Sequence, residues 1–220
     1  MNRRVIPIDG GFFNDGYWYV LGSTSLGGSH LTAEEIGKKL QSDQDEIFKD
    51  LLGQGICLPL YFPGDCALDQ AIVIVGDLTA QEEAEWIGKI TSYLEIPCGE
   101  FMIMGGGLEE DFEVALTHFE SPDPHYQFFQ KIRVEPGCYK VEIYAYVPSM
   151  TFHFDWEDEI GEERELQFIE NWWQQTRAGQ PYPSWLIEAQ EKTYINQEDA
   201  DLVDYLIRLV PTDEAIAIPP

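Results

Sequence analysis

The sequence has few basic residues. Thirteen lysines and arginines stand against 40 aspartates and glutamates, which gives a formal net charge of −27. A surface of this sign repels the phosphates of nucleic acids and anionic membranes, and it attracts cations or basic proteins. We therefore expect no binding to nucleic acid or to a membrane, and a basic protein is the partner that the charge favours. The same charge also suits a surface that only keeps the protein soluble.

Long apolar runs and paired cysteines are missing as well. No stretch approaches the ~18 consecutive apolar residues of a transmembrane helix, and "MNRRVIPIDGGFF" contains no apolar run of signal-peptide length. The four cysteines form no C-x-x-C pair, which excludes a zinc knuckle and a thioredoxin-type motif. Cys57 and Cys66 flank a turn and could face each other across a hairpin. We favour the alternative, in which both are reduced thiols in the core. These absences predict a soluble, cytoplasmic protein.

The common catalytic motifs are absent too. The run "MGGGLEED" lacks the Lys-Ser/Thr of a phosphate-binding loop, and "IVIVGDLT" is followed by no Gly-x-Gly-x-x-Gly. No Gly-x-Ser-x-Gly elbow occurs, which argues against a serine hydrolase. The sequence therefore marks no nucleotide site and no catalytic nucleophile.

The composition is that of a packed globular protein. The 220 residues are 44% hydrophobic and 13% aromatic, enough for a substantial core. We expect one globular domain over residues 1–210, followed by a C-terminal arm or disordered tail at 211–220. Hydrophobic alternation and β-branched runs predict strands at 17–22, 55–62, 70–77, 99–107, 112–120, 126–134 and 138–148. The segment 202–210 reads as a strand or as a helical turn, and we favour the strand.

Helices are predicted where capping boxes precede apolar residues at three- and four-residue spacing. Thr32 with Glu35 begins one helix, interrupted near Ser42, and Thr79 with Glu82 begins a second helix that extends to about residue 96. A third is expected over 161–178. The fold class is therefore α+β: a β-rich, mostly antiparallel, sandwich-like core with two or three helices packed on its faces or edges.

Two histidines carry the metal hypothesis. His118 and Glu120 lie two residues apart on a predicted strand, and so do His153 and Asp155, which puts each pair on one side of a sheet. If the two strands were neighbours, these four side chains could converge on a divalent metal, as in facial-triad sites. A divalent metal is the one cofactor left open. The other reading is a solvent-facing strand side, with Phe152, Phe154 and Trp156 buried.

A run of acids follows the second pair. Asp158, Glu159, Glu162 and Glu163 lie at or before the first turn of the third predicted helix, where negative charge favours the helix dipole. The same residues are candidates for contact with a basic partner.

One hairpin resembles a known family. The segment "RVEPGCYKVEIYAYVPS" (133–149) is similar to a stretch of competence protein J-type nuclease inhibitors. Elsewhere "LPLYFPGD", "DLTAQEEAEWI", "IPCGEFMIMGGG" and "YLIRLVP" resemble uncharacterised bacterial β-sandwich proteins. The first resemblance covers 17 residues and transfers no catalytic residue. It implies an acidic protein that covers the active surface of a basic one.

Three functions remain open from the sequence. The first is a non-enzymatic protein-binding module, inhibitor- or immunity-like, whose negative surface engages a basic partner. The second is a metal-dependent enzyme that uses His118, Glu120, His153 and Asp155. The third is a structural domain without a site of its own. The sequence leaves the oligomeric state open.

Overall fold

The computed structural model describes residues 3–8, 18–41, 45–61, 71–107, 110–146, 170–181 and 205–213. The strands are β1 (Arg4–Pro7), β2 (Trp18–Ser23), β3 (Cys57–Tyr61), β4 (Ala71–Val75), β5 (Gly88–Ile96), β6 (Glu100–Met104), β7 (Phe129–Arg133), β8 (Gly137–Ala145) and β9 (Tyr205–Pro211). The helices are η1 (Leu26–Gly28), α1 (Ala33–Leu40), α2 (Asp45–Gly53), α3 (Ala80–Ala84) and α4 (Glu110–Thr117). Residues 170–176 are also helical.

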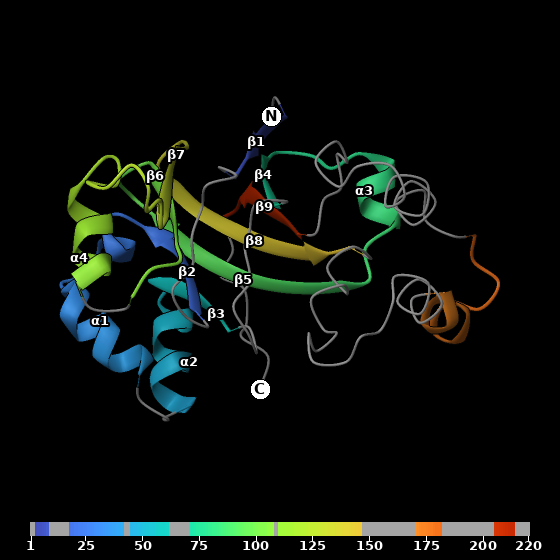
Figure 1. The fold of residues 1–220 in the computed structure, drawn as a ribbon, viewed down its shortest axis with the longest axis horizontal. Coiled ribbons are helices and arrows are strands. Elements are labelled where there is room, and N and C mark those ends of the chain that lie inside the picture. The colour runs from blue at the N-terminus through green and yellow to red at the C-terminus, as the bar shows by residue number, and fades with distance from the viewer. Residues whose placement is uncertain are drawn as a thin grey trace.

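The strands form two sheets (Figure 1). The five-stranded sheet has the order β1-β4-β9-β8-β5, and the four-stranded sheet has the order β3-β2-β6-β7. All neighbouring strands are antiparallel except β4 and β9, which are parallel. The expected α+β class with a mostly antiparallel, sheet-rich core is confirmed.

The main core lies between the two sheets. Strand alternation sends Val141 and Ile143 of β8 and Ile207 and Leu209 of β9 to this side, where they meet Phe101 and other residues of the four-stranded sheet. The strand predicted at 202–210 is confirmed as β9. It lies inside the five-stranded sheet, between β4 and β8, with Val73 opposite Ile207 and Val141 opposite Leu209.

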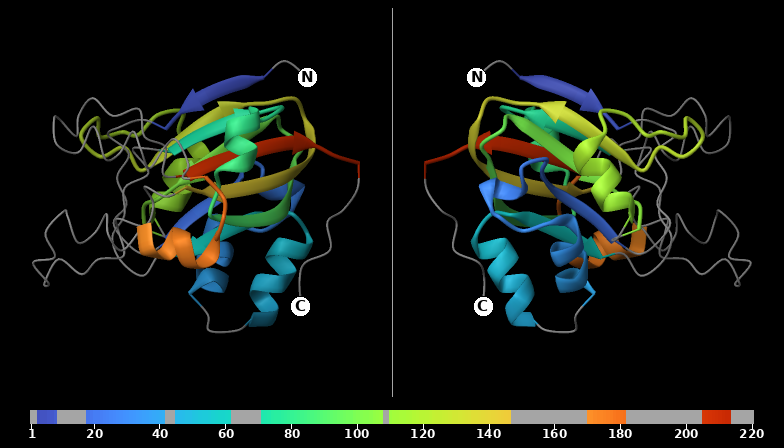
Figure 2. Two further views of the ribbon diagram at one scale, coloured as in Figure 1. Left: turned by 90° about the vertical axis from the view of Figure 1, so that its right-hand side faces the viewer. Right: turned by 90° about the vertical axis from the view of Figure 1, so that its left-hand side faces the viewer.

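Helices cover the far side of the four-stranded sheet. Ile36 and Leu40 of α1, Leu51 of α2 and Phe112 of α4 pack there with Met102 of β6. Figure 2 shows that α1 and α2 lie on this side of the molecule and that β1 lies at the opposite edge. The order of layers is therefore helices, four-stranded sheet, five-stranded sheet.

Both predicted capping boxes are present. Thr32 accepts a hydrogen bond from the Glu35 amide at 3.2 Å, and the Glu35 carboxylate accepts one from the Thr32 amide at 2.8 Å. At α3, Thr79 and Glu82 make the same reciprocal pair at 3.2 and 2.7 Å. These bonds satisfy amides that would otherwise lack a partner in the first turn.

The second predicted helix is wrong beyond residue 84. The chain leaves α3 at Glu85, and residues 88–96 form β5 instead. Ile90 and Leu94 fit a helical stripe, but they also fit strand alternation with Ser92 and Ile96. Gly88 and the β-branched and aromatic residues of "GKITSYLEI" favour the extended form, and pairing with β8 along its full length stabilises it.

The strand predicted over 112–120 is also wrong. Residues 110–117 form α4, in which Phe112 and Ala115 are buried three residues apart. The alternation of Phe112, Val114 and Leu116 suggested a strand. Ala115 is apolar as well, however, so Phe112 and Ala115 fit the buried face of a helix equally well. Acidic residues in the first turn then favour the helix dipole.

Candidate functional site

A buried carboxylate lies on the outer face of the five-stranded sheet. Glu142 points away from the core between the sheets, as the alternation of Lys140, Glu142 and Tyr144 against Val141 and Ile143 predicted. It is only 3% exposed. A carboxylate so far from water must be paired, because burying an unpaired charge is costly.

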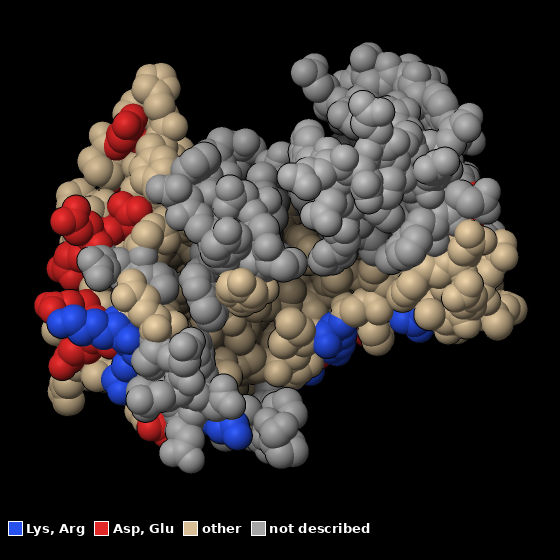
Figure 3. Space-filling view, turned by 60° about the horizontal axis from the view of Figure 1, so that its bottom comes forward, with Lys and Arg blue, Asp and Glu red and all other residues tan. Residues whose placement is uncertain are grey.

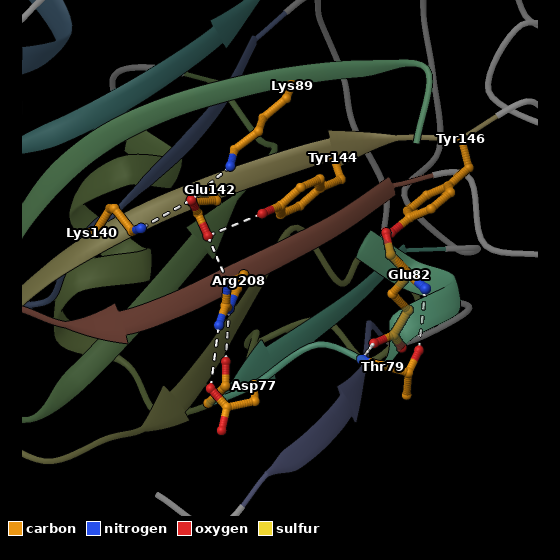
Figure 4. A network of polar contacts seen from close by, with 10 residues as sticks. Asp77, Thr79, Glu82, Lys89, Lys140, Glu142, Tyr144, Tyr146 and Arg208 are labelled. Atoms are coloured by element: carbon orange, nitrogen blue, oxygen red, sulfur yellow. Dashed lines mark hydrogen bonds and ion pairs between the residues drawn. The ribbon is translucent and has the colours of Figure 1, made fainter. Parts of the chain in front are cut away.

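Four side chains surround Glu142, and together they form what we call the Glu142 network (Figure 4). Lys89 Nζ and Lys140 Nζ both contact Oε1, at 2.7 and 3.1 Å. Arg208 Nη1 and the Tyr144 hydroxyl donate to Oε2, each at 3.0 Å. Both carboxylate oxygens are therefore fully engaged, by residues from β5, β8 and β9.

Arg208 connects this network to the end of β4. Its Nε donates to the Gly76 carbonyl at 2.8 Å, and Nη2 contacts Asp77 Oδ1 at 3.4 Å. The Asp77 side chain is 83% exposed, whereas the Arg208 side chain is 14% exposed. The guanidinium is consequently held in one orientation across three strands.

Glu142 and its cationic partners favour each other's charged forms. Burial raises the pKa of Glu142, but hydrogen bonds from Lys89, Lys140 and Tyr144 outweigh it and hold this pKa at about 2. Burial lowers the pKa of Lys89, but the bonds to Glu142 and Tyr144 outweigh it and raise the pKa above its ordinary value. At neutral pH Glu142 is thus ionised and Lys89 protonated, so neither is poised as a general acid or base.

The same sheet face continues toward Cys138. Its Sγ donates to Glu95 Oε2 at 2.9 Å, and the Tyr93 hydroxyl donates to the other oxygen of that carboxylate. This hydrogen bond and partial burial raise the pKa of Cys138 to about 11. The thiol is therefore protonated at neutral pH and is not an activated nucleophile.

A second polar arrangement fixes α3. The Tyr146 hydroxyl donates to the Glu82 carbonyl at 2.7 Å, and Arg3 Nη2 pairs with Glu82 Oε1 at 2.5 Å. Because Glu82 also completes the capping box with Thr79, these contacts have a structural role.

Acidic side chains gather at the end of the molecule formed by α1 and α4, where basic side chains lie among them (Figure 3). The basic residues of α1 are Lys38, which pairs with Glu34, and Lys39. The two helices pack against each other. We call this surface the acidic end, and its acids in the first helical turns are Glu34 and Glu35 of α1 with Glu110, Asp111 and Glu113 of α4. All but Asp111 are exposed. Asp111 instead accepts hydrogen bonds from the Gly107 amide at 2.8 Å and from the Tyr126 hydroxyl at 3.3 Å.

The turn after α4 carries an exposed aromatic. Phe119 is 67% exposed and lies between His118 and Glu120, which are exposed as well. His118 follows directly on α4, and its Nδ1 lies 3.0 Å from the Thr117 hydroxyl. An apolar ring thus stands on the surface just after the C-terminal end of α4, next to Glu120 in the sequence.

The four residues of the metal hypothesis are only partly described. His118 and Glu120 lie in this turn and not on a strand, so strand alternation no longer aligns them. His153 and Asp155 fall outside the described residues, as do Asp158, Glu159, Glu162 and Glu163. Within the described residues no group of three or more His, Cys, Asp or Glu side chains could hold a metal ion. The four-residue metal site therefore stays a prediction.

The sequence reading overlooked the Glu142 network, although two signals pointed to it. Arg208 is the one charge within the apolar run "YLIRLVP", and a charge in a buried strand needs a partner. Glu142 and Lys140 occupy one side of β8, where the alternation was read correctly. The sequence does not show that β8 and β9 are neighbours, which is what places Arg208 opposite Glu142.

No family model matches the chain, and no curated protein matches it. Among solved structures, one described as "Crocagin biosynthetic gene J" is 12% identical with a TM-score of 0.48, covering 96% of this chain and 99% of that one. Another, "ComJ, inhibitor of the DNA degrading activity of NucA, from Bacillus subtilis", is 8% identical with a TM-score of 0.35, covering 96% of each chain. The suspected weak resemblance to competence protein J-type proteins is confirmed at low similarity for the chain as a whole, the comparison does not single out residues 133–149, and these likenesses carry no argument about function.

Among the described residues, no helix combines the length and the apolar character that crossing a membrane requires.

Proposed function

We propose that the protein is a non-enzymatic binding module, inhibitor- or immunity-like, whose negative surface engages a basic protein partner in the cytoplasm. The observation that carries this proposal is the acidic end, together with the exposed Phe119 that follows α4. The overall charge of −27 gives the same sign of attraction at longer range.

The composition of this surface suits protein recognition. Interfaces combine a few aromatic anchors with a polar rim, and the anchors contribute most of the binding energy. Phe119 supplies such an anchor with Glu120 next to it in the sequence, and Glu110 and Glu113 add negative charge at the first turn of α4. Helix stability alone accounts for acids in the first turns of α1 and α4. It does not account for an aromatic ring left 67% exposed at the helix end.

The acids outside the described residues join the same proposal. Asp158, Glu159, Glu162 and Glu163 add negative charge that a basic partner would contact. The oligomeric state of the protein is a separate question, and size-exclusion chromatography with light scattering would measure it.

Affinity capture from the native cell, carried out over a range of salt concentrations, tests the proposal. We expect a basic protein that binds at low salt and is released as salt rises, because screening weakens contacts between exposed charges. Glu113→Lys and Phe119→Ala should each reduce capture. Glu83→Lys is the matched control, since Glu83 is exposed on α3, away from the acidic end.

A captured protein that is indifferent to salt, or that binds Glu113→Lys as well as the unaltered chain, would contradict the proposal. Failure to capture any basic protein would favour the structural-domain alternative.

A further inference from the structure

The Glu142 network contains more positive than negative charge. Lys89, Lys140 and Arg208 converge on one buried carboxylate, and among the described residues the only other acid paired with them is the exposed Asp77. We propose that this part of the outer sheet face is a binding site for a single oxyanion, the phosphate or carboxylate group of a small ligand. The proposal does not depend on the acidic end.

Glu142 cannot neutralise its three cations. Each of its oxygens already takes two donors, and the ammonium groups of Lys89 and Lys140 share Oε1. Like charges held close together repel, and partial removal from water adds to the cost. A second anion placed against the two ammonium groups would relieve that repulsion.

The donors for such an anion are present and face solvent. An ammonium group has three N–H donors, and the only ion pair of the Lys140 ammonium among the described residues is with Glu142. The side chain of Lys140 is 35% exposed and that of Lys89 is 30% exposed. Each ammonium can therefore donate outward while it keeps its bond to Glu142.

The site is also held in place before a ligand arrives. Arg208 is fixed by Gly76 and Asp77, and Lys89 Nζ lies 4.8 Å from the centre of the Tyr144 ring. Ordering side chains is a main cost of forming a complex, and little of it is required here because the site is already held in place.

The charge of the whole chain limits the class of ligand. A polyanion such as nucleic acid would meet the repulsion of a chain with a net charge of −27. A small oxyanion feels mainly the cations that it touches, because at physiological salt charges beyond about 8 Å are largely screened. The ligand that this geometry favours is therefore a small molecule with one phosphate or carboxylate group, and not a large polyanion.

Amide chemical shifts measured by NMR test the proposal with inorganic phosphate as the probe. The protein is kept in a chloride buffer at neutral pH, and sodium phosphate is compared with sodium chloride at equal ionic strength. We expect phosphate, but not chloride, to shift the β5 and β8 amides near Lys89 and Lys140 until they saturate. A parallel titration with sodium acetate decides the class: saturation by acetate as well indicates any oxyanion, and saturation by phosphate alone indicates a phosphate ligand.

Variants connect the signal to the network. Lys140→Gln should weaken phosphate binding at least tenfold, with Lys89→Gln as a second variant should the first fold poorly. Lys38→Gln is the control, because Lys38 forms an exposed pair with Glu34 on α1. Shifts that chloride reproduces, that fail to saturate with either oxyanion, or that persist unchanged in both Lys140→Gln and Lys89→Gln would overturn the proposal.

Discussion

Glu142 and Arg208 face each other across β8 and β9, and an ion pair of 3.0 Å joins them on the outer side of the five-stranded sheet. Arg208 lies on a strand whose Ile207 and Leu209 enter the main core. The pair therefore adds a side-chain contact to the backbone pairing of two neighbouring strands of the sheet.

Replacing Glu142 with glutamine should destabilise the protein. Three cations would lose their shared carboxylate, and removing one partner of a buried pair leaves the other charges uncompensated. We expect a loss of roughly 2–4 kcal/mol in the free energy of unfolding at neutral pH, below the extreme for buried pairs because both lysines reach solvent. Urea denaturation measures it, and Glu83→Gln on α3 should change the value by less than about 0.5 kcal/mol.

The contribution of Glu142 should depend on pH. Its pKa of about 2 in the folded protein lies below its ordinary value of 4.5, so the folded state holds its proton less tightly than the unfolded state does. The stabilisation is complete above pH 4.5 and is lost as pH falls through 2. The difference in unfolding free energy between the unaltered chain and Glu142→Gln should therefore shrink over this range, and a constant difference would contradict the assignment.

The capping box of α3 can be tested with a matched pair of substitutions. Thr79→Ala removes the hydroxyl oxygen that accepts a hydrogen bond from the Glu82 amide, and it should lower the free energy of unfolding by about 1 kcal/mol. Thr79→Ser keeps that oxygen and should cost much less. Thermal and urea unfolding of both variants measure the difference, and equal losses would show that the hydroxyl does not cap the helix.

Truncating the two phenylalanines at α4 should change stability to very different extents. Phe112 is fully buried, so Phe112→Ala should lower the free energy of unfolding by about 3–5 kcal/mol. Phe119 is 67% exposed, so Phe119→Ala should change it by less than about 0.5 kcal/mol. If Phe119→Ala destabilised the fold strongly, the ring would have a packing role and the proposed anchor would be lost.

The described cysteines should differ in reactivity. Burial raises the pKa of Cys98, but hydrogen bonds from Ser25 and Thr24 outweigh it and lower this pKa, and the residue is exposed. Burial raises the pKa of Cys57 to about 12. Iodoacetamide at neutral pH followed by peptide mass spectrometry should find Cys98 modified first, before Cys138 and Cys57. Equal rates at Cys98 and Cys57 would argue against the buried position of Cys57.

Local signals in the sequence were sufficient for much of the fold. The capping boxes at Thr32 and Thr79 mark helix starts, because their side chains satisfy amides within the same turn. The alternation along 137–145 separates the core side of β8 from its outer side. Both depend only on residues a few positions apart.

Errors arose where two periodicities fit the same residues. Ile90 and Leu94 lie four residues apart, a spacing that is shared by one face of a helix and by one side of a strand. Pairing with β8 decides between them, and that contact is distant in sequence. The Glu142 network is hidden for the same reason, since it joins Lys89, Glu142 and Arg208 from three separated strands.

The position of β9 affects how the chain can fold during synthesis. The parallel partner β4 and the antiparallel partner β8 are both made well before residues 205–211. Until those residues leave the ribosome, β4 and β8 each present an edge with unpaired amide and carbonyl groups. Such edges pair readily with other chains. The growing chain is thus exposed to mispairing over the whole interval between β8 and β9, and a chaperone that covers strand edges would act in that interval.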